Sequence, residues 1–479
     1  MRVLLLRPIP SSERFGLGPF FRIEPLGMEY IAAALEAQGH AVTLADLRFT
    51  RTIEQQLRAS RPRLVGIAAM HALETDAVLQ VAARVRQAAP EAFILVGGHS
   101  AAAYPKPFLT SDVDAICVDD GELVMPRVAE AIERGWKMTD VPGLLLVDRT
   151  QATGSRRTAG ETGIFELDSV PLPARHHVAP WQSKYACLAH RPTWLVETAR
   201  GCPFRCSFCS VWPLYDRSVR ERSIDSVCRD FASVGDHVFV ADDLFWHHPP
   251  RSRALAQELR RRGIRKQWVL VQSRVDLVAR HPELLEAWKP FAREFDIFFG
   301  LEAATNEGLA SLVKDTTVDR TSQAIAIARE IGFGVTGNFV IDPAWGESDF
   351  ERLWTFIEQQ QLWNAGFTIL TPVPGTDYYE QMKSTIGQRD WSHFDMHHLL
   401  WEPKLGAERF FELYCQTWRR SILNLSGRKR WWQWLADARI RDALFLTRML
   451  LRTQNMMDPK HYLREHTYTI SRMRRQSAA

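Results

Sequence analysis

Long hydrophobic segments are absent from this chain. No run of about 18 uncharged apolar residues occurs in its 479 positions, so no membrane-spanning helix is predicted. The N-terminal segment 1–8 is too short, and too soon interrupted by arginine, to be a signal peptide. Internal repeats and low-complexity tracts are absent as well. We therefore expect a cytoplasmic protein.

The chain also lacks a large excess of charge of either sign, and most of its cysteines are not paired in sequence. The net charge is +4, which is too small to predict a nucleic-acid partner by itself, and we expect none. The seven cysteines are an odd number, and four of them lie singly, at Cys117, Cys187, Cys228 and Cys415. That pattern argues against a disulfide framework. The hydrophobic share of 46% is that of a globular protein, and the length is sufficient for two or three domains.

Residues 1–150 alternate short apolar runs with helical patterns. This alternation predicts an α/β domain with a doubly wound parallel sheet covered by helices. Glycine-bearing loops follow two of the predicted strands, at Gly97-Gly98-His99-Ser100 and at Gly121-Glu122, so a ligand crevice is expected at the carboxyl edge of the sheet. The predicted strands are Val3–Leu6, Val42–Ala45, Leu64–Ala69, Phe93–Val96 and Ala115–Val118.

Three further regions follow. Residues 151–193 carry several prolines and little periodicity, which predicts a linker. Residues 194–385 form a second strand–helix series, which predicts a partial (βα)6 barrel. Residues 386–479 are helical, aromatic and basic, and we expect a helical cap there. The six predicted barrel strands are Trp194–Thr198, Val238–Ala241, Trp268–Gln272, Asp296–Leu301, Val335–Ile341 and Phe367–Thr371.

Three cysteines lie in a loop directly after the first predicted barrel strand. Cys202, Cys206 and Cys209 have C-x3-C-x2-C spacing, with Gly201 and Pro203 inside the loop. Thiolates are the usual ligands of iron–sulfur clusters, and three of them leave one iron of a four-iron cluster open to a small molecule. The alternative is a structural zinc site, which needs four closed ligands. The other cysteines offer no partner pair for such a site.

This spacing, at the mouth of a predicted βα barrel, resembles the signature of the radical S-adenosylmethionine (SAM) superfamily. The resemblance implies a [4Fe–4S] cluster whose open iron binds SAM, and one-electron cleavage of SAM to a 5′-deoxyadenosyl radical. It also places Asp242 and Asp243 at an acceptor site for the SAM ammonium group, and Arg274 and Glu302 at contacts to the SAM carboxylate and ribose. The alternatives are a helix N-cap for the two aspartates and a barrel salt bridge for the other two residues.

The N-terminal domain resembles the cobalamin-binding domain of cobalamin-dependent radical SAM enzymes. The resemblance implies contacts from Gly97, Gly98 and His99, and from the Gly121-Glu122 pair, to the corrin. The D-x-H-x-x-G motif that supplies a lower cobalt ligand elsewhere is missing, since the second strand is followed by Asp46-Leu47-Arg48-Phe49. We therefore expect no histidine ligand there. The alternative for this domain is a response-regulator-like interaction module.

Over most of its length the chain most resembles the hopanoid C-3 methylases, and next the anaerobic magnesium-porphyrin oxidative cyclases. The resemblance implies methylation of an unactivated sp³ carbon of a small-molecule or lipid substrate, with methylcobalamin as the methyl donor and an electron donor such as flavodoxin or ferredoxin. An oxidative cyclase would share these cofactors. A tRNA methylthiolating enzyme would need a second cluster, and a cobalamin sensor would leave the cysteine loop unexplained. The resemblance is carried by 22–29, 96–101, 201–222, 262–267, 299–303, 342–345, 371–376 and 394–398.

The C-terminal region combines aromatic, aliphatic and basic residues. Basic helices of this kind can lie on an anionic membrane surface, so we expect peripheral contact with the inner face of the cytoplasmic membrane. The alternative is that the aromatic residues form the core of the cap. The residues concerned are Trp391, Trp401, Trp418, Trp431, Trp432 and Trp434, with Arg428, Lys429, Arg430, Arg439, Arg441, Arg448 and Arg452.

Overall fold

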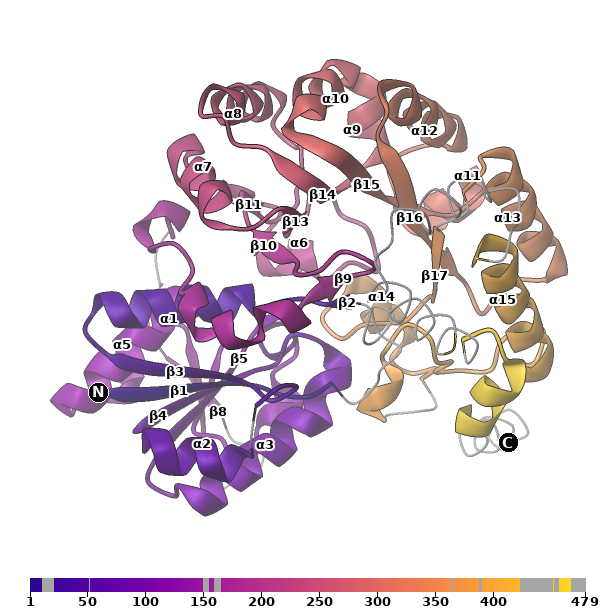
Figure 1. Cartoon of the computed structure of the whole chain (residues 1–479). Helices are drawn as coiled ribbons and strands as arrows, with labels where there is room; N and C mark the ends of the chain where they lie inside the picture. The colour runs from indigo at the N-terminus through magenta and orange to yellow at the C-terminus, as the bar shows by residue number, and fades with distance from the viewer. Residues whose placement is uncertain are drawn as a thin grey trace.

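A seven-stranded sheet forms the N-terminal unit of the computed structural model (Figure 1). Its order is β3-β1-β4-β5-β6-β7-β8. The parallel strands are β1 (Arg2–Arg7), β3 (Ala41–Asp46), β4 (Leu64–Ala68), β5 (Phe93–Gly97) and β6 (Ala115–Cys117), and the antiparallel ones are β7 (Leu144–Val147) and β8 (Ser155–Arg157). The structure describes residues 1–10, 21–50, 52–149, 155–158, 165–362, 365–386, 390–422, 451 and 456–466.

Helices cover both faces of this sheet, as the doubly wound prediction requires. In β1, Val3 and Leu5 pack with α1 (Leu26–Ala37) and α5 (Gly121–Arg134), while Leu4 and Leu6 pack with α2 (Ile53–Ser60) and α3 (Thr75–Ala88). Successive residues of a strand point to opposite faces, so a strand buried on both faces must be apolar throughout. The prediction of a doubly wound parallel sheet is confirmed.

The range predicted as a linker also contributes to the sheets. β8 (Ser155–Arg157) extends the N-terminal sheet beyond residue 150. β9 (Ala186–Cys187) pairs antiparallel with β2 (Phe21–Arg22), which follows β1 by a short stretch of chain. The described part of the range 151–193 is therefore ordered against the N-terminal unit.

Six parallel strands form the central barrel sheet, in the sequential order β10-β13-β14-β15-β16-β17. All six strands predicted from apolar runs are confirmed. Sequential order results when each strand is followed by a helix that returns the chain to the next strand on the same side. The strands are β10 (Trp194–Val196), β13 (His237–Val240), β14 (Lys266–Ser273), β15 (Ala292–Glu302), β16 (Gly334–Ile341) and β17 (Ala365–Ile369). The outer helices are α7 (Ile224–Ser233), α8 (Pro249–Arg261), α9 (Val275–Arg280), α10 (Pro282–Trp288), α11 (Asn306–Ser311), α12 (Val318–Ile331) and α13 (Glu347–Gln359).

After the barrel, α14 (Asp377–Met382) leads to the long α15 (Ala407–Ile422), which packs on the outside of β17 (Figure 1). Trp418 of α15 is 3% exposed and meets Phe367 edge to face, so it belongs to the core of the cap. None of the helices in the described ranges is long and apolar enough to cross a bilayer. Trp391 and Trp401 are partly buried against a small apolar cluster that includes Phe394 and Leu400. The remaining residues predicted to contact a membrane, from Arg428 to Arg452, lie outside the described residues.

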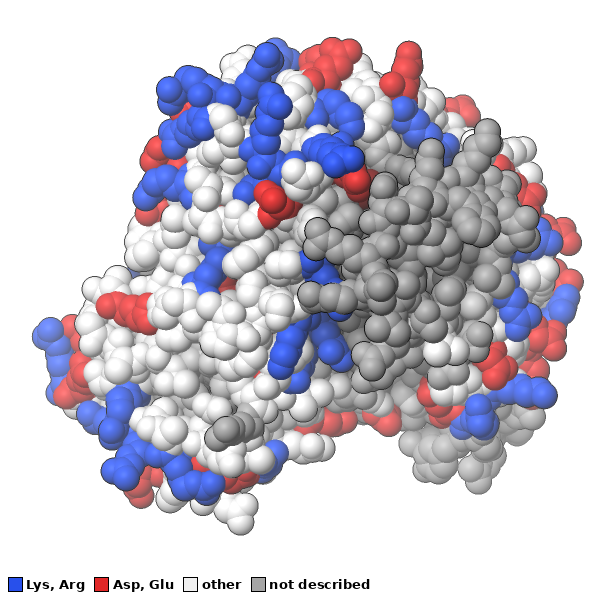
Figure 2. All heavy atoms as spheres, viewed as in Figure 1, with Lys and Arg blue, Asp and Glu red and all other residues white. Residues whose placement is uncertain are grey.

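Charged side chains are mixed over the described part of the face seen in Figure 2. Basic residues gather near α8, but acidic neighbours compensate them. Arg261 and Arg262 both pair with Glu258, at 2.6 and 2.7 Å. The mixture agrees with the small net charge.

Candidate functional site

A short antiparallel pair closes the loop that carries the three cysteines. β11 (Ala199–Arg200) pairs with β12 (Arg220–Glu221), and α6 (Val211–Leu214) lies between them. Gly201 begins the loop with φ +103°, and a Cβ at this position would lie 2.2 Å from the carbonyl oxygen of Ser218. Only glycine fits both the conformation and the space. The loop geometry therefore depends on Gly201.

The three thiols of the loop are free and gathered in one place. Burial, with smaller contributions from the neighbouring Cys206 and Cys202, raises the pKa of Cys209 to about 12. Burial also raises the pKa of Cys202, again with a contribution from Cys206. Three crowded thiols whose charged forms would repel one another suit a cluster, because iron supplies the positive charge that stabilises thiolates. The donor set fits a cluster held by three cysteines.

Arg274 lies against this loop from the end of β14. Its Nη1 is 3.9 Å from Cys206 Sγ, and its guanidinium carbon is 3.6 Å from the centre of the Phe204 ring. Asp276 accepts a hydrogen bond from Nε at 2.7 Å and fixes the side chain. The buried cation therefore faces the position of the cluster. A direct contact between Arg274 and SAM stays a prediction.

The two aspartates after β13 have different surroundings. Asp242 is buried and accepts hydrogen bonds from the backbone N–H groups of Thr198 and Ala199 at 2.6 and 3.1 Å, and from the Thr198 hydroxyl at 2.5 Å. Burial raises the pKa of Asp242 from its ordinary 3.8 to about 7. Asp243 is exposed and accepts a hydrogen bond from the Gly201 N–H at 2.9 Å. Asp242 thus holds the chain that leads into the cysteine loop, and Asp243 has the open position.

Glu302 ends β15 in an unusual backbone conformation. Its φ is +61°, and the pairing of β15 with β16 shifts register between Gly300 and Glu302. The Glu302 carboxylate accepts a hydrogen bond from Lys314 Nζ at 2.9 Å, and both side chains are buried. A Cβ at Gly300 would lie 2.5 Å from Glu302 Oε1 and 2.7 Å from Lys314 Nζ. Strained backbone of this kind persists where the surroundings hold it, and it is common at functional sites. Lys314 is a site residue that the sequence reasoning missed.

An ion-pair network joins the cysteine loop to the N-terminal unit. Arg200, directly before Gly201, pairs with Asp120 at 2.9 Å, with Glu122 at 2.8 Å and with Glu197 at 3.0 Å. Arg220 of β12 also pairs with Asp120, at 2.5 Å. Glu122, predicted as a cofactor contact, is engaged here in an ion pair between the two units. The other residues of this ion-pair network were not among the predicted site residues.

The loops after β5 and β6 account for the remaining predicted residues. Gly98 has φ +115°, and a Cβ would lie 2.8 Å from the carbonyl oxygen of Ala69. His99 contacts Ser210 Oγ at 2.8 Å through Nε2, and burial lowers the pKa of His99 to about 4, so its imidazole is neutral. Ser210 directly follows Cys209, the third cysteine of the loop. The helix that follows β5, α4 (His99–Ala103), therefore touches the cysteine loop.

Two glycines in this region have packing roles. A Cβ at Gly97 would lie 3.1 Å from Cys117 Cβ, and one at Gly121 would lie 2.8 Å from Ile31 Cδ1. Both distances are at or below the closest ordinary approach, so small residues allow β5 to lie near β6 and α5 to lie near α1. Their predicted contacts to a cofactor stay predictions.

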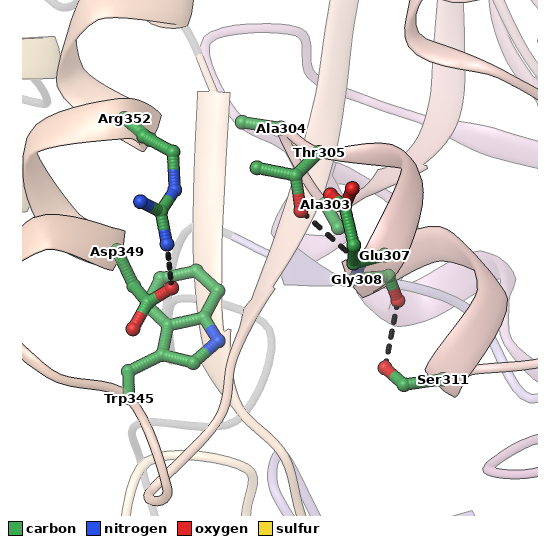
Figure 3. A pocket seen from close by; sticks show the side chains of 9 residues that line it. All are labelled: Ala303, Ala304, Thr305, Glu307, Gly308, Ser311, Trp345, Asp349 and Arg352. Atoms are coloured by element: carbon green, nitrogen blue, oxygen red, sulfur yellow. Dashed lines mark hydrogen bonds and ion pairs between the residues drawn. The ribbon is translucent and has the colours of Figure 1, made fainter.

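A cavity of about 520 Å³ opens beyond the ends of β15 and β16. Figure 3 shows Thr305 and Glu307 on one side, and Trp345 with the Asp349–Arg352 ion pair on the other. The volume is within the range of small-molecule sites. The cavity begins one residue after Glu302, so it adjoins the strained end of β15.

Comparisons with known proteins agree with this geometry. Residues 20–129 match the family described as B12 binding domain, and residues 196–357 match the radical SAM superfamily. The hopanoid C-3 methylase of Methylococcus capsulatus is 30% identical over 425 residues, which are 87% of this chain and 79% of that protein. The anaerobic magnesium-protoporphyrin IX monomethyl ester cyclase of Rubrivivax gelatinosus is 24% identical over 446 residues, which are 88% of this chain and 78% of that protein.

Solved structures share the fold over most of this chain. The cobalamin-dependent SAM radical enzyme OxsB, with aqua-cobalamin and SAM bound, superposes with a TM-score of 0.70 at 16% identity, over 98% of this chain and 75% of that one. The radical SAM methyltransferase TsrM from Kitasatospora setae gives 0.63 at 19% identity, over 81% and 77%. The two family matches and the methylase relative together show that this chain is an enzyme of the cobalamin-dependent radical SAM methyltransferase family, with cobalamin, SAM and a [4Fe–4S] cluster as its cofactors.

Proposed function

We propose that this enzyme methylates an unactivated sp³ carbon of a polycyclic lipid, and that the substrate is a hopanoid modified at C-3. The observation that carries the proposal is the 30% identity to a hopanoid C-3 methylase over 87% of this chain. An unactivated carbon has neither an acidic proton nor a lone pair, so ordinary polar methyl transfer cannot reach it. Bound together, the cofactors supply hydrogen abstraction and methyl delivery, which this reaction needs.

The residues of the chain would divide the work as follows. Cys202, Cys206 and Cys209 would hold the cluster, and the buried Arg274 cation, 3.9 Å from one of the sulfurs, would balance part of its negative charge. Asp243 would accept a hydrogen bond from the SAM ammonium group, because this residue is exposed shortly after β13 while the buried Asp242 already accepts three hydrogen bonds.

Two further groups would hold the ligands in place. The Glu302–Lys314 pair, fixed at the end of β15, would contact the SAM ribose or carboxylate. The backbone at Gly97 and Gly98 would lie along the corrin, since these positions tolerate no side chain or only a small one. We assign cobalamin to residues 1–150, SAM to the barrel at 194–385, and a substrate cap that draws lipid from the membrane to 386–479.

The test is the reaction itself. Anaerobically reconstituted enzyme would be given SAM, methylcobalamin, a reducing partner such as flavodoxin, and a hopanoid, and the products would be analysed by mass spectrometry. We expect a mass gain of one methylene unit together with 5′-deoxyadenosine. Cys206→Ala should give neither product. SAM cleavage without any change in the lipid would refute the substrate class while leaving the family assignment intact.

A second candidate is an oxidative cyclase of the magnesium-protoporphyrin monomethyl ester type. The 24% identity to such a cyclase over 88% of this chain favours it. The cyclase would install oxygen rather than a methyl group. Product mass from the same assay, repeated with the porphyrin ester, distinguishes the two functions.

A further inference from the structure

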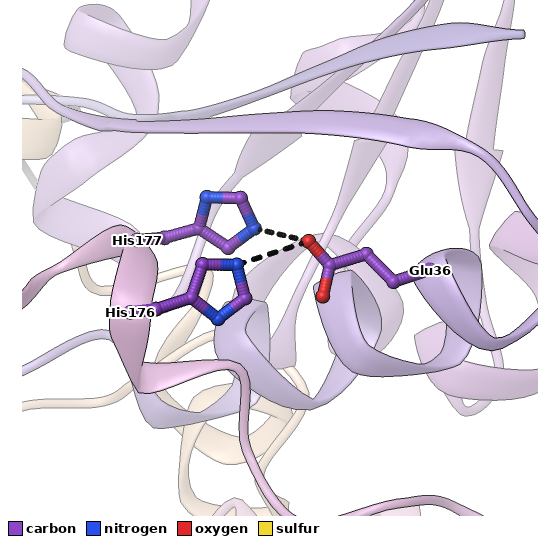
Figure 4. A group of neighbouring side chains, drawn as sticks. All are labelled: Glu36, His176 and His177. Atoms are coloured by element: carbon purple, nitrogen blue, oxygen red, sulfur yellow. Dashed lines mark hydrogen bonds and ion pairs between the residues drawn. The ribbon is translucent and has the colours of Figure 1, made fainter.

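Two histidines and a glutamate converge far from the cysteine loop. Glu36 lies in the last turn of α1, and His176 and His177 lie in the 3-10 helix η6 (Arg175–His177), in the region between the two units (Figure 4). The Nε2 atoms of His176 and His177 lie 3.1 and 2.8 Å from the same oxygen, Glu36 Oε1. The three candidate ligand atoms all lie within 4.8 Å of one another.

The ligand set is that of a divalent transition metal. Two imidazole nitrogens and one carboxylate oxygen suit Zn²⁺, which binds such atoms at about 2.0–2.2 Å. Tetrahedral bonds of that length separate the ligand atoms by about 3.3 Å. The two separations between the imidazole nitrogens and Glu36 Oε1 are shorter than this by only a few tenths of an ångström, so small side-chain rotations of His176 and His177 would make room for the ion.

The electrostatic surroundings also favour a cation. Among the described residues, the ion-pair partners of Glu36 are these two imidazoles. The adjacent Arg175 donates instead to Asp230 and to the Leu195 carbonyl oxygen. The His176 side chain is 64% exposed, so water can reach a remaining coordination position.

The chain contains a second group of the same composition, and it lacks these features. His247 and His248 both contact Glu221, through Nε2 at 2.8 Å and Nδ1 at 3.1 Å. Arg251 Nε lies 3.5 Å from the same carboxylate, so a positive charge is already present. The candidate ligand atoms of this group, all within the described residues, do not converge within 4.8 Å of one another. Composition alone therefore does not distinguish the Glu36 group, whereas its geometry and charge do.

We propose that Glu36, His176 and His177 bind one Zn²⁺ ion, with water completing the coordination, and that the ion fastens the segment before the barrel to helix α1. The site is independent of the proposed methylation. It would stabilise the contact between the N-terminal unit and the segment that leads into β10, since anything that binds only the folded form shifts the equilibrium toward it.

The test uses the full chain, purified anaerobically with its cluster in place. Samples are stripped of loosely bound metal, dialysed against a series of free Zn²⁺ concentrations, and analysed for zinc and iron together by mass spectrometry. We expect one zinc ion per chain more in the unsubstituted protein than in Glu36→Gln. His176→Ala and His177→Ala should each weaken zinc binding by at least about tenfold, since even outer-sphere changes cost that much.

Two controls make the outcome decisive. The iron content of each sample shows whether the cysteine loop is filled, so zinc bound by empty thiols is recognised. Glu221→Gln, in the matched group, should leave zinc binding unchanged. Equal zinc content in the unsubstituted protein and Glu36→Gln would overturn the proposal. So would an anomalous diffraction peak at the zinc edge located anywhere other than between these three side chains.

Discussion

Removing the Arg200 side chain should loosen the cysteine loop far more than removing a neighbouring exposed arginine. In Arg200→Met, Glu122 would lose its cation while only 6% exposed. Asp120 would keep Arg220, and Glu197 would keep a weak pairing at 3.9 Å with another arginine. Leaving a buried charge unpaired costs about 3–5 kcal/mol, and the remaining pairs place this case near 3. At about 1.4 kcal/mol for each factor of ten, the loop should open about 100-fold more often.

Hydrogen–deuterium exchange of the β11 and β12 amides measures this opening directly, because exchange of protected amides follows the local opening free energy. The matched control is Arg205→Met, in the same loop. Arg205 pairs with Asp377 at 3.3 Å, with the two side chains 60% and 40% exposed, and such pairs contribute about 1 kcal/mol at most. Equal exchange in the two variants would show that the network does not hold the loop.

Three further substitutions test the site. Gly201→Ala should abolish iron loading, measured per chain, whereas Gly263→Ala, which has positive φ but open space around its Cβ, should load normally. Lys314→Met should weaken SAM binding, measured by calorimetry, because it leaves the buried carboxylate at the end of β15 unpaired; Lys383→Met, in an exposed pair, should not. In the unsubstituted protein, the raised pKa of Asp242 should make the free energy of unfolding fall as the pH rises from about 4 to about 7. Asp242→Asn should keep the fold and abolish this fall, which denaturation midpoints at several pH values would measure. The sign follows from a raised folded-state pKa: the protonated form is favoured by folding, so stability falls as pH rises through this window, and a slope unchanged by the substitution would contradict it.

The regular strands were predictable because burial on both faces requires continuous apolar runs. The same reasoning could have found β7, whose sequence is Leu-Leu-Leu-Val at residues 144–147. β8 could not be found in this way. Its three residues, Ser155–Arg157, are all exposed, and it forms by backbone pairing to β7 at the edge of the sheet. Hydrophobic patterning carries no information about such a strand.

The cysteine loop was predictable for a different reason, since its ligands are close together in sequence. The residues that stabilise the loop are mostly far apart in sequence. Arg200 meets Asp120 across 80 positions and Glu122 across 78, and Lys314 meets Glu302 across 12. No local spacing indicates these pairs. Nor could the sequence distinguish Asp242 from Asp243. The two differ because Thr198 and Ala199, which are distant in sequence, donate hydrogen bonds to Asp242 and not to Asp243.

The contacts between the two units bear on how one substrate would reach both cofactors in the proposed reaction. In the described part of the barrel sheet, β10 and β17 are the edge strands. Helix α4 (His99–Ala103), directly after β5, contacts the chain that follows β10, through His99 and Ser210. It also contacts the chain that follows β17, where a Cβ at Gly375 would lie 2.7 Å from Ala103. Ligands of parallel sheets bind at the carboxyl ends of strands, and here the carboxyl ends of both sheets face each other. With cobalamin and SAM at these ends, as we propose, their separation would be set by this interface and not by either sheet alone.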